Sequence, residues 1–204
     1  MSKYINKIIY INLDKRSDRL QEIQNELQNY DLINNSERFS AIYHSMGIVG
    51  CGRSHLSVLK IAKEKKYENV LILEDDFYFT VSKDEFEKNL NLFFESNIDY
   101  DVCMLSYNLI KYEELPEYPF LLKVLDAQTA SGYIINEKYY DVLIKLYEEA
   151  MPLLESTQMH WVYANDQIWK KKQITDKWYC FKTRLGKQRD GFSDNANSYM
   201  NYDC

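Results

Sequence analysis

Turn-forming residues and membrane-spanning segments are both scarce in this sequence. Its 204 residues include only 6 Gly and 3 Pro, so neither a disordered chain nor a repeat array is indicated. No window approaches the length of a membrane span. The apolar stretch within residues 1–13 is too short and too interrupted for a signal peptide. We therefore expect a cytoplasmic protein with no transmembrane segment.

Closely paired cysteines and clustered positive charge are absent as well. The four cysteines are scattered, so their spacing indicates neither a zinc site nor a disulfide framework. The formal net charge is −6, and the run Lys170–Lys172 is short enough to be a solvated helix end. Nucleic acid is therefore excluded as the expected partner, because phosphate binding draws on concentrated Lys and Arg.

The sequence does have the composition of a folded domain. Hydrophobic residues make up 46% of the chain and charged residues 27%. The length fits one domain over residues 1–204, with enough chain to bury a substantial core. Residues 186–204 are polar, and we expect them to form a flexible tail that closes over the functional site.

Strand and helix patterns alternate along the chain. Period-2 or continuous apolar runs predict strands, and apolar residues at helical spacing predict helices. Residues 110–119 contain two of the prolines and predict a surface excursion. This alternation favours an α/β sandwich with a mainly parallel sheet. The expected strands are 7–13, 38–42, 70–73, 100–105, 121–125, 132–135 and 178–181. The expected helices are 17–30, capped by Ser17, 51–66 after a Gly-containing loop at 47–50, 83–94, 136–150 and 165–172.

The most informative segment is Val70–Phe79, an apolar run that continues into three acids, Glu74, Asp75 and Asp76. A buried strand reads as such a run, and ligands in open α/β sheets gather at the carboxyl ends of the strands. Three crowded carboxylates repel one another unless a cation neutralises them. Hard oxygen ligands select Mg²⁺ or Mn²⁺, usually together with substrate phosphates. The sequence therefore predicts a metal–diphosphate site here.

Several further motifs occur in a fixed order. They are Ile9–Leu13 with Arg16, Asp18 and Arg19, then Arg38–Ala41, Gly50–His55, Leu73–Asp76, Ser131–Tyr133, Ala164–Asp166 and Gly191–Asp194. Together they resemble glycosyltransferase family 25, the group of lipopolysaccharide and procollagen galactosyltransferases. The similarity spans nearly the whole chain, and seven motifs in order are hard to obtain by chance.

The resemblance implies a GT-A type, Rossmann-like α/β/α fold, a nucleotide-sugar donor and a divalent cation, Mn²⁺ or Mg²⁺. It implies transfer of a hexose, galactose or glucose, from a UDP-sugar to a hydroxyl of a glycan or a hydroxylysine-type protein acceptor. The metal ligands it implies are Asp76, Glu74 and Asp194. The implied donor-binding residues are Asn12, Leu13, Arg16, Arg19, Ala41, Ser54, His55, Glu74, Asp75, Ser131 and Gly132.

Each of these residues has a possible role in donor binding and an alternative role in solvation or packing. The guanidinium groups of Arg16 and Arg19 follow the first strand, where they can contact a phosphate or remain solvated. Ala41 leaves room for a base, or packs as a small core residue. His55 can orient a carboxylate or stay a satisfied core histidine, and Ser54 can bond its own helix backbone.

Asp166 is the expected general base. An inverting transfer needs one carboxylate to take the proton from the acceptor hydroxyl while the metal–diphosphate departs. The alternative is that Asn165–Asp166 only begins a helix. We expect inversion with a single base, and retention of configuration is the alternative that the sequence leaves open.

Two readings from other classes remain open. A non-catalytic nucleotide-sugar or glycan binder would keep the same fold. A receiver-type signalling domain would share the acid pair, but its phosphoacceptor would be Asp101, at the wrong end of the next strand. The short chain leaves little room for an acceptor domain, which is compatible with a homodimer or with a partner protein that presents the acceptor.

Overall fold

The computed structural model describes residues 4–193 and 198–200. Its elements in chain order are β1 (Lys7–Asn12), α1 (Ser17–Asn29), β2 (Ser36–Ser40), α2 (Gly47–Glu64), β3 (Asn69–Glu74), β4 (Phe77–Phe79), α3 (Lys83–Glu95), β5 (Val102–Met104), β6 (Asn108–Glu114), β7 (Leu121–Gln128), β8 (Gly132–Asn136), α4 (Tyr140–Thr157), α5 (His160–Tyr163), α6 (Asn165–Ile168), α7 (Lys170–Gln173), β9 (Trp178–Phe181), β10 (Gly186–Gln188), β11 (Gly191–Ser193) and β12 (Ser198–Met200).

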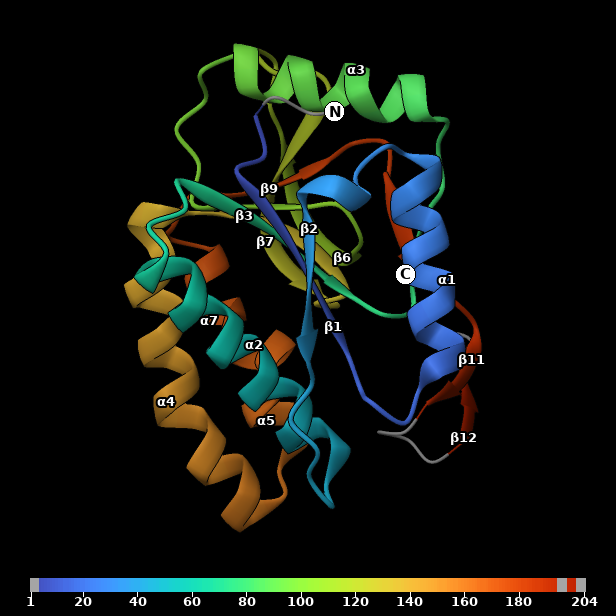
Figure 1. Cartoon of the computed structure of the whole chain (residues 1–204). Helices are drawn as coiled ribbons and strands as arrows, with labels where there is room; N and C mark the ends of the chain where they lie inside the picture. The colour runs from blue at the N-terminus through green and yellow to red at the C-terminus, as the bar shows by residue number, and fades with distance from the viewer. Residues whose placement is uncertain (1–3, 194–197, 201–204) are drawn as a thin grey trace.

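An eight-stranded sheet in the order β2-β1-β3-β8-β5-β9-β7-β6 forms the centre of the molecule (Figure 1). Following the pairings across the sheet, six strands run in one direction, and β8 and β7 run against them. The predicted α/β fold with a mainly parallel sheet is therefore confirmed. The antiparallel strand β8 lies between β3 and β5, so these two strands share a direction without being direct neighbours.

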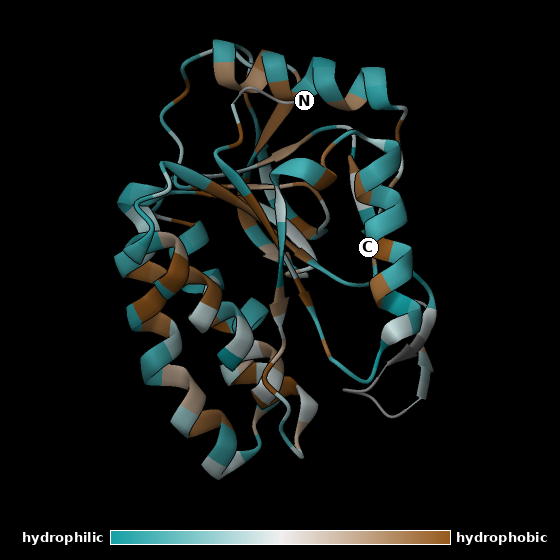
Figure 2. Ribbon diagram, in the orientation of Figure 1, coloured by the Kyte–Doolittle hydropathy of each residue, from teal (hydrophilic) through white to brown (hydrophobic). Residues whose placement is uncertain are grey.

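Alternating side chains of the central strands feed two separate cores. Ile9 of β1 and Ile72 of β3 belong to the core beneath α2 and α4. Their sequence neighbours, Ile8 and Leu71, belong to the core beneath α1 and α3. Because successive strand residues point to opposite faces, a continuous apolar run is what a sheet covered on both sides requires. Figure 2 shows brown, hydrophobic strands at the centre of the molecule and helices in which hydrophobic and hydrophilic residues alternate.

The carboxyl ends of three parallel strands meet at one edge of the sheet. Ile11 of β1 lies opposite Glu74 of β3, and Asn12 lies opposite Ser40 of β2. The loops that follow, 13–16, 41–46 and 75–76, are therefore brought together. This register places Glu74, Asp75 and Asp76, here called the acid motif, where the sequence predicted a ligand site.

Several local predictions were wrong, each for a physical reason. Arg16 is the N-cap residue of α1 and makes no side-chain capping bond, so Ser17 is not the cap but the first helical residue. The expected surface excursion at 110–119 is partly β6, an exposed edge strand paired with β7. Helix α4 continues to Thr157 although Pro152 lies inside it, and Leu154 beyond the proline is buried in the core beneath α2 and α4. Helix α2 begins at Gly47, so the expected loop at 47–50 is its first turn.

The end of the chain carries more structure than its polarity indicates. The helix expected at 165–172 is two short helices, α6 and α7, separated at Trp169, whose side chain is fully buried. Strand β10 pairs with β4, and β11 pairs with β12. Short strands of this kind have no periodic hydrophobic pattern, so they were not predicted.

Candidate active site

The acid motif lies at the end of β3 and is buried there. Asp75 and Asp76 form the turn between β3 and β4, and they are only 8% and 5% exposed. The ring of Phe77, the next residue, packs against two glycines. A Cβ atom on Gly132 would lie 2.5 Å from this ring, and a Cβ atom on Gly186 would lie 2.1 Å from it. These two glycines therefore allow the aromatic ring to pack directly behind the acids.

Arg19 of α1 joins the two aspartates. Its Nη1 lies 3.1 Å from Asp75 Oδ1 and 2.9 Å from Asp76 Oδ2. Gln188 of β10 donates a second hydrogen bond to Asp76 Oδ2, at 3.0 Å. The other oxygen, Asp76 Oδ1, is buried and has no hydrogen-bond partner among the described residues.

This arrangement leaves negative charge only partly compensated. Burial raises the pKa of Asp76 to about 7, the nearby Glu74 carboxylate adds to the shift, and Arg19 opposes it. Burial also raises the pKa of Asp75, again against the pull of Arg19. A buried carboxylate oxygen without a donor, beside two more carboxylates, is what a missing cation would produce. The residues present therefore fit the expected hard divalent cation.

Asn12 holds Asp75 from the side. Its Nδ2 donates to Asp75 Oδ2 at 2.7 Å and to the carbonyl oxygen of Arg16 at 3.0 Å. The orientation of this amide is fixed by Arg38, whose Nε donates to Asn12 Oδ1 at 3.0 Å. The buried Asn12 thus holds Asp75 in its orientation. Arg38 holds Asn12 in turn, a role that the sequence did not predict.

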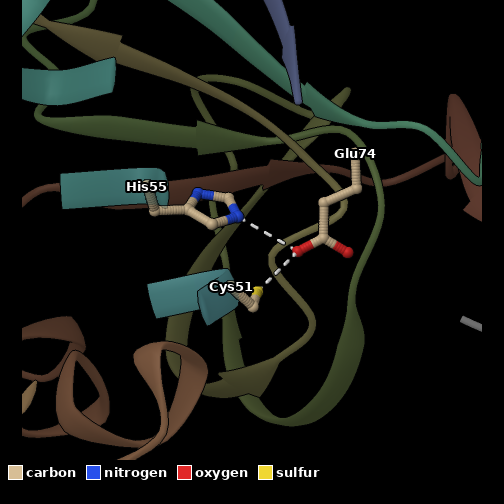
Figure 3. A group of neighbouring side chains, drawn as sticks. All are labelled: Cys51, His55 and Glu74. Atoms are coloured by element: carbon tan, nitrogen blue, oxygen red, sulfur yellow. Dashed lines mark hydrogen bonds and ion pairs between the residues drawn. The ribbon is translucent and has the colours of Figure 1, made fainter. Parts of the chain in front are cut away.

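Glu74 turns away from the aspartates toward α2. Its Oε1 accepts from Cys51 Sγ at 3.4 Å and lies 3.0 Å from His55 Nε2 (Figure 3). Burial is the largest single effect and works against ionisation of Glu74, but the hydrogen bond and electrostatic attraction of His55, the Cys51 hydrogen bond and the charge of Arg19 together outweigh it and lower the pKa of this carboxyl group. Burial, together with the Glu74 charge, raises the pKa of the Cys51 thiol well above its ordinary value.

A cavity of about 260 Å³ opens in front of these groups. Its walls come from the loop after β1, the loop between β2 and α2, the first turns of α2, and the acid motif. Among the predicted site residues, those that line it are Leu13, Arg16, Arg19, Ala41, Ser54, Glu74, Asp75 and Asp76. Ala41 and Leu13 supply an apolar wall, whereas Arg16 and Arg19 supply positive charge.

The remaining predicted residues within the described part of the chain lie behind that wall. His55 and Ser131 are fully buried, and Ser131 Oγ hydrogen-bonds Ser106 Oγ at 2.6 Å. Gly132 packs against Phe77. Ser54, which also lines the cavity, accepts a hydrogen bond from the backbone N–H of Ile42 at 2.8 Å and donates to the carbonyl oxygen of Gly50 at 2.7 Å, so it connects the loop after β2 to α2. Asp194 lies outside the described residues.

Asp166 lies at the start of α6, near Cys51 and Glu74 but not in the lining of this cavity. Its Oδ2 accepts the backbone N–H of Thr129 at 3.2 Å, and burial raises its pKa. Thr129 has a φ of 81°, a conformation that β-branched residues rarely adopt. Such strain often occurs at functional sites. The general-base role of Asp166 remains a prediction.

The loop between β2 and α2 contributes lining residues that the sequence reasoning missed. Tyr43, His44 and Ser45 line the cavity, and so does Lys15 on the opposite side. Tyr43 is 72% exposed, and the Lys15 ammonium lies 5.8 Å from the centre of its ring. In the sequence, these lining residues are marked only by their position after a predicted strand. Any loop that follows one of the parallel strands faces the same edge of the sheet.

Comparison with known proteins establishes the fold. No family model matches the sequence, and no curated protein matches it either. A glycosyltransferase involved in the glycosylation of the major capsid of PBCV-1 has a TM-score of 0.54 at 12% identity, covering 89% of this chain and 92% of that chain. The mannose-1-phosphate geranyltransferase from Thermus thermophilus has a TM-score of 0.50 at 8% identity, covering 93% and 75% of the respective chains. The chain has a glycosyltransferase-like fold.

Within residues 4–193 and 198–200, no helix has both the length and the apolar composition needed to cross a bilayer.

Asp101, the residue that a receiver domain would need as its phosphoacceptor, precedes β5 and accepts the backbone N–H of Lys177 at 2.8 Å. Since β5 and β3 run in the same direction, Asp101 lies at the sheet edge opposite the acid motif. This position excludes the phosphoacceptor geometry of a receiver domain.

Proposed function

We propose that this protein is a metal-dependent glycosyltransferase of the family 25 type, which moves a hexose, galactose or glucose, from a UDP-sugar to a hydroxyl group of a glycan or protein acceptor. One observation carries the proposal. Asp76 is buried at the carboxyl end of β3, one of its oxygens has no hydrogen-bond partner among the described residues, and it lies at the wall of a cavity that Arg16 and Arg19 also line.

The donor would occupy the cavity of about 260 Å³. Arg16 and Arg19 would face the diphosphate, because guanidinium groups match phosphate oxygens in shape and charge. Ala41 and Leu13 would pack against the base, and the exposed ring of Tyr43 would stack on it. The similar fold of the PBCV-1 capsid glycosyltransferase supports this use of the site.

Asp76 and Asp75 are the carboxylates that would hold Mn²⁺ or Mg²⁺, with Asp194 as a further candidate. Glu74, which was also predicted from the sequence as a ligand of this ion, faces Cys51 and His55 instead and would add only its negative charge nearby. The bound cation would stabilise the negative charge that builds up on the diphosphate leaving group. Arg19 already bridges the two aspartates, so it keeps them together and adds positive charge beside the leaving group. Asn12, held by Arg38, fixes the orientation of Asp75.

Asp166 would take the proton from the acceptor hydroxyl. Its raised pKa brings the carboxylate closer to the working range of a general base. The hydrogen bond from Thr129 fixes one of its oxygens, and Asn165 beside it reaches Cys51 on α2.

The direct test is a transfer assay with the purified chain. UDP-galactose and UDP-glucose, each with and without Mn²⁺, would be incubated with hydroxyl acceptors, and the release of UDP would be measured. Metal-dependent UDP release with one of the two donors is the expected result. Metal-dependent binding of the donor without any release would instead identify a non-catalytic nucleotide-sugar binder.

A further inference from the structure

Cys51, His55 and Glu74 form a compact group of metal-ligand atoms, here called the Cys-His-Glu cluster (Figure 3). Cys51 and His55 are four residues apart on α2, so both side chains lie on one face of the helix. Glu74 is the last residue of β3 and points at that face. One thiol sulfur, one imidazole nitrogen and one carboxylate oxygen lie within 4.8 Å of one another.

The donor types, and two of the three separations between ligand atoms, are close to those of a zinc site. Zinc binds Cys sulfur at about 2.3 Å, His nitrogen at about 2.0–2.1 Å and carboxylate oxygen at about 2.0–2.2 Å. At tetrahedral angles these bonds would put the ligand atoms roughly 3.4–3.6 Å apart. The observed separations are 3.4 Å for Cys51 Sγ to Glu74 Oε1 and 3.0 Å for His55 Nε2 to the same oxygen. Small side-chain adjustments would therefore admit the ion.

His55 and Cys51 each have a further hydrogen-bond partner outside the cluster, as metal-binding residues usually do. His55 Nδ1, the ring nitrogen that faces away from Glu74, lies 3.0 Å from the hydroxyl of Tyr133. A ligating histidine almost always hydrogen-bonds through its other nitrogen, which fixes the tautomer and the ring plane. Asn165 Nδ2 lies 3.6 Å from Cys51 Sγ, where it can donate to the sulfur.

The open side of the cluster faces the cavity. Cys51 and Glu74 both line it, whereas His55 is fully buried. Three protein ligands with a fourth direction open to a cavity is the arrangement that leaves room for water or a ligand on zinc. This environment differs from that of Asp76, whose surroundings are carboxylate and guanidinium groups that suit a hard cation.

We propose that the Cys-His-Glu cluster is a binding site for a thiophilic divalent cation of the Zn²⁺ class, separate from the hard-cation site at Asp76. When the ion binds, a bond forms to the Cys51 sulfur and the thiol proton passes to solvent. The proton that His55 Nε2 shares with Glu74 must leave that nitrogen when the ion takes its place, and the imidazole keeps one proton on Nδ1, where it faces the Tyr133 hydroxyl. No electron transfer is involved, and neither nucleotide nor acceptor is required.

Cobalt gives a direct test, because a cobalt–thiolate bond produces a charge-transfer band in the near ultraviolet. The full chain, stripped of metal, would be titrated with Co²⁺ in excess Mg²⁺ and without nucleotide. We expect one equivalent to produce the band and Zn²⁺ to abolish it. The variant Cys51→Ser should lack the band and bind Zn²⁺ about 100-fold more weakly or worse, beyond the ~10- to 100-fold typical of losing a supporting partner.

Two control variants locate the signal. Cys204→Ser removes the cysteine that lies outside the described residues and should leave the band unchanged. Asp76→Asn should also leave it unchanged, because its carboxylate is assigned to the other cation. If Cys51→Ser does not fold, X-ray absorption of the zinc-loaded wild-type chain replaces it and should show one sulfur and one imidazole ligand.

The proposal is overturned if one equivalent of Co²⁺ gives no thiolate band, if the band survives in Cys51→Ser, or if zinc has no sulfur ligand in the absorption spectrum. The result is independent of the transferase proposal, because no nucleotide is present in the titration. Failure of donor binding with Mn²⁺ would leave the cobalt result as it stands.

Discussion

At the scale of single residues, Asp76 is the centre of the account. Its carboxylate is buried, one oxygen contacts Arg19 and Gln188, and the other contacts no donor among the described residues. A native protein seldom keeps a buried acceptor unsatisfied without a functional reason. A bound cation would satisfy that oxygen and would also relieve its repulsion with Glu74.

The raised pKa of Asp76 predicts a pH dependence of stability in the metal-free protein. The folded chain holds this proton up to a pKa of about 7, against an ordinary value of 3.8. The resulting stabilisation is fully present below 3.8 and is lost as pH rises through 7. Urea unfolding between pH 4 and 8 should therefore show a decline that is smaller in Asp76→Asn, which stays uncharged. Equal slopes for the two proteins would contradict the assignment.

Asp166 allows a second prediction at this scale. Asp166→Asn removes the base but keeps an oxygen that can accept the Thr129 N–H. The rate of transfer should fall by ~10²- to 10⁴-fold, the usual value of a positioned base. Donor binding measured by titration should stay nearly unchanged. A variant that loses donor binding but keeps its turnover rate would show that Asp166 is not the base.

At the scale of elements, the site depends on how α2 meets the loop after β2. A Cβ atom on Gly50 would lie 2.4 Å from the carbonyl oxygen of Ile42, so only glycine permits this approach. Ser54 then receives the N–H of Ile42. Together these contacts fix the backbone beside Ala41, which forms one wall of the cavity.

Two serines of α2 make a matched test of this contact. Ser54 and Ser57 both donate to the carbonyl oxygen four residues earlier, but only Ser54 also holds the loop. Ser54→Ala should cost about 0.5–1.5 kcal/mol, the usual net value of one hydrogen bond, because it leaves the partly buried Ile42 N–H without this partner, and it should weaken nucleotide binding. Ser57→Ala should change both quantities little. Thermal unfolding and nucleotide titration of both variants check this, and equal effects would rule out a special role for the loop contact.

The strands that position the site were predictable from sequence, and the supports of the site were not. Val70–Leu73 reads as a buried strand because it is apolar throughout, so the location of Glu74–Asp76 at its end followed directly. The supporting contacts join residues far apart in the chain, such as Arg38 with Asn12 and Gln188 with Asp76. No local pattern marks such pairs. Strand β4 was also missed, because three residues are too few for a recognisable alternation.

At the scale of the whole molecule, the fold separates scaffold from site. Two cores on opposite faces hold the sheet rigid, while the loops at one edge of β1, β2 and β3 carry most of the lining of the cavity. The chain then returns from β9, and Gln188 of β10 touches Asp76. The acid motif is thus enclosed by segments from the beginning, the middle and the end of the described chain.

The central claim is that Asp76 and its neighbours bind a nucleoside diphosphate through a divalent cation. Calorimetric titration of the purified chain with UDP, in the presence and absence of Mn²⁺, tests it most directly, with Asp76→Asn as the matched variant. We expect UDP to bind the wild-type chain only when Mn²⁺ is present, and we expect this binding to be lost in Asp76→Asn. No binding in the wild-type chain, or equal binding with and without Mn²⁺, would contradict it.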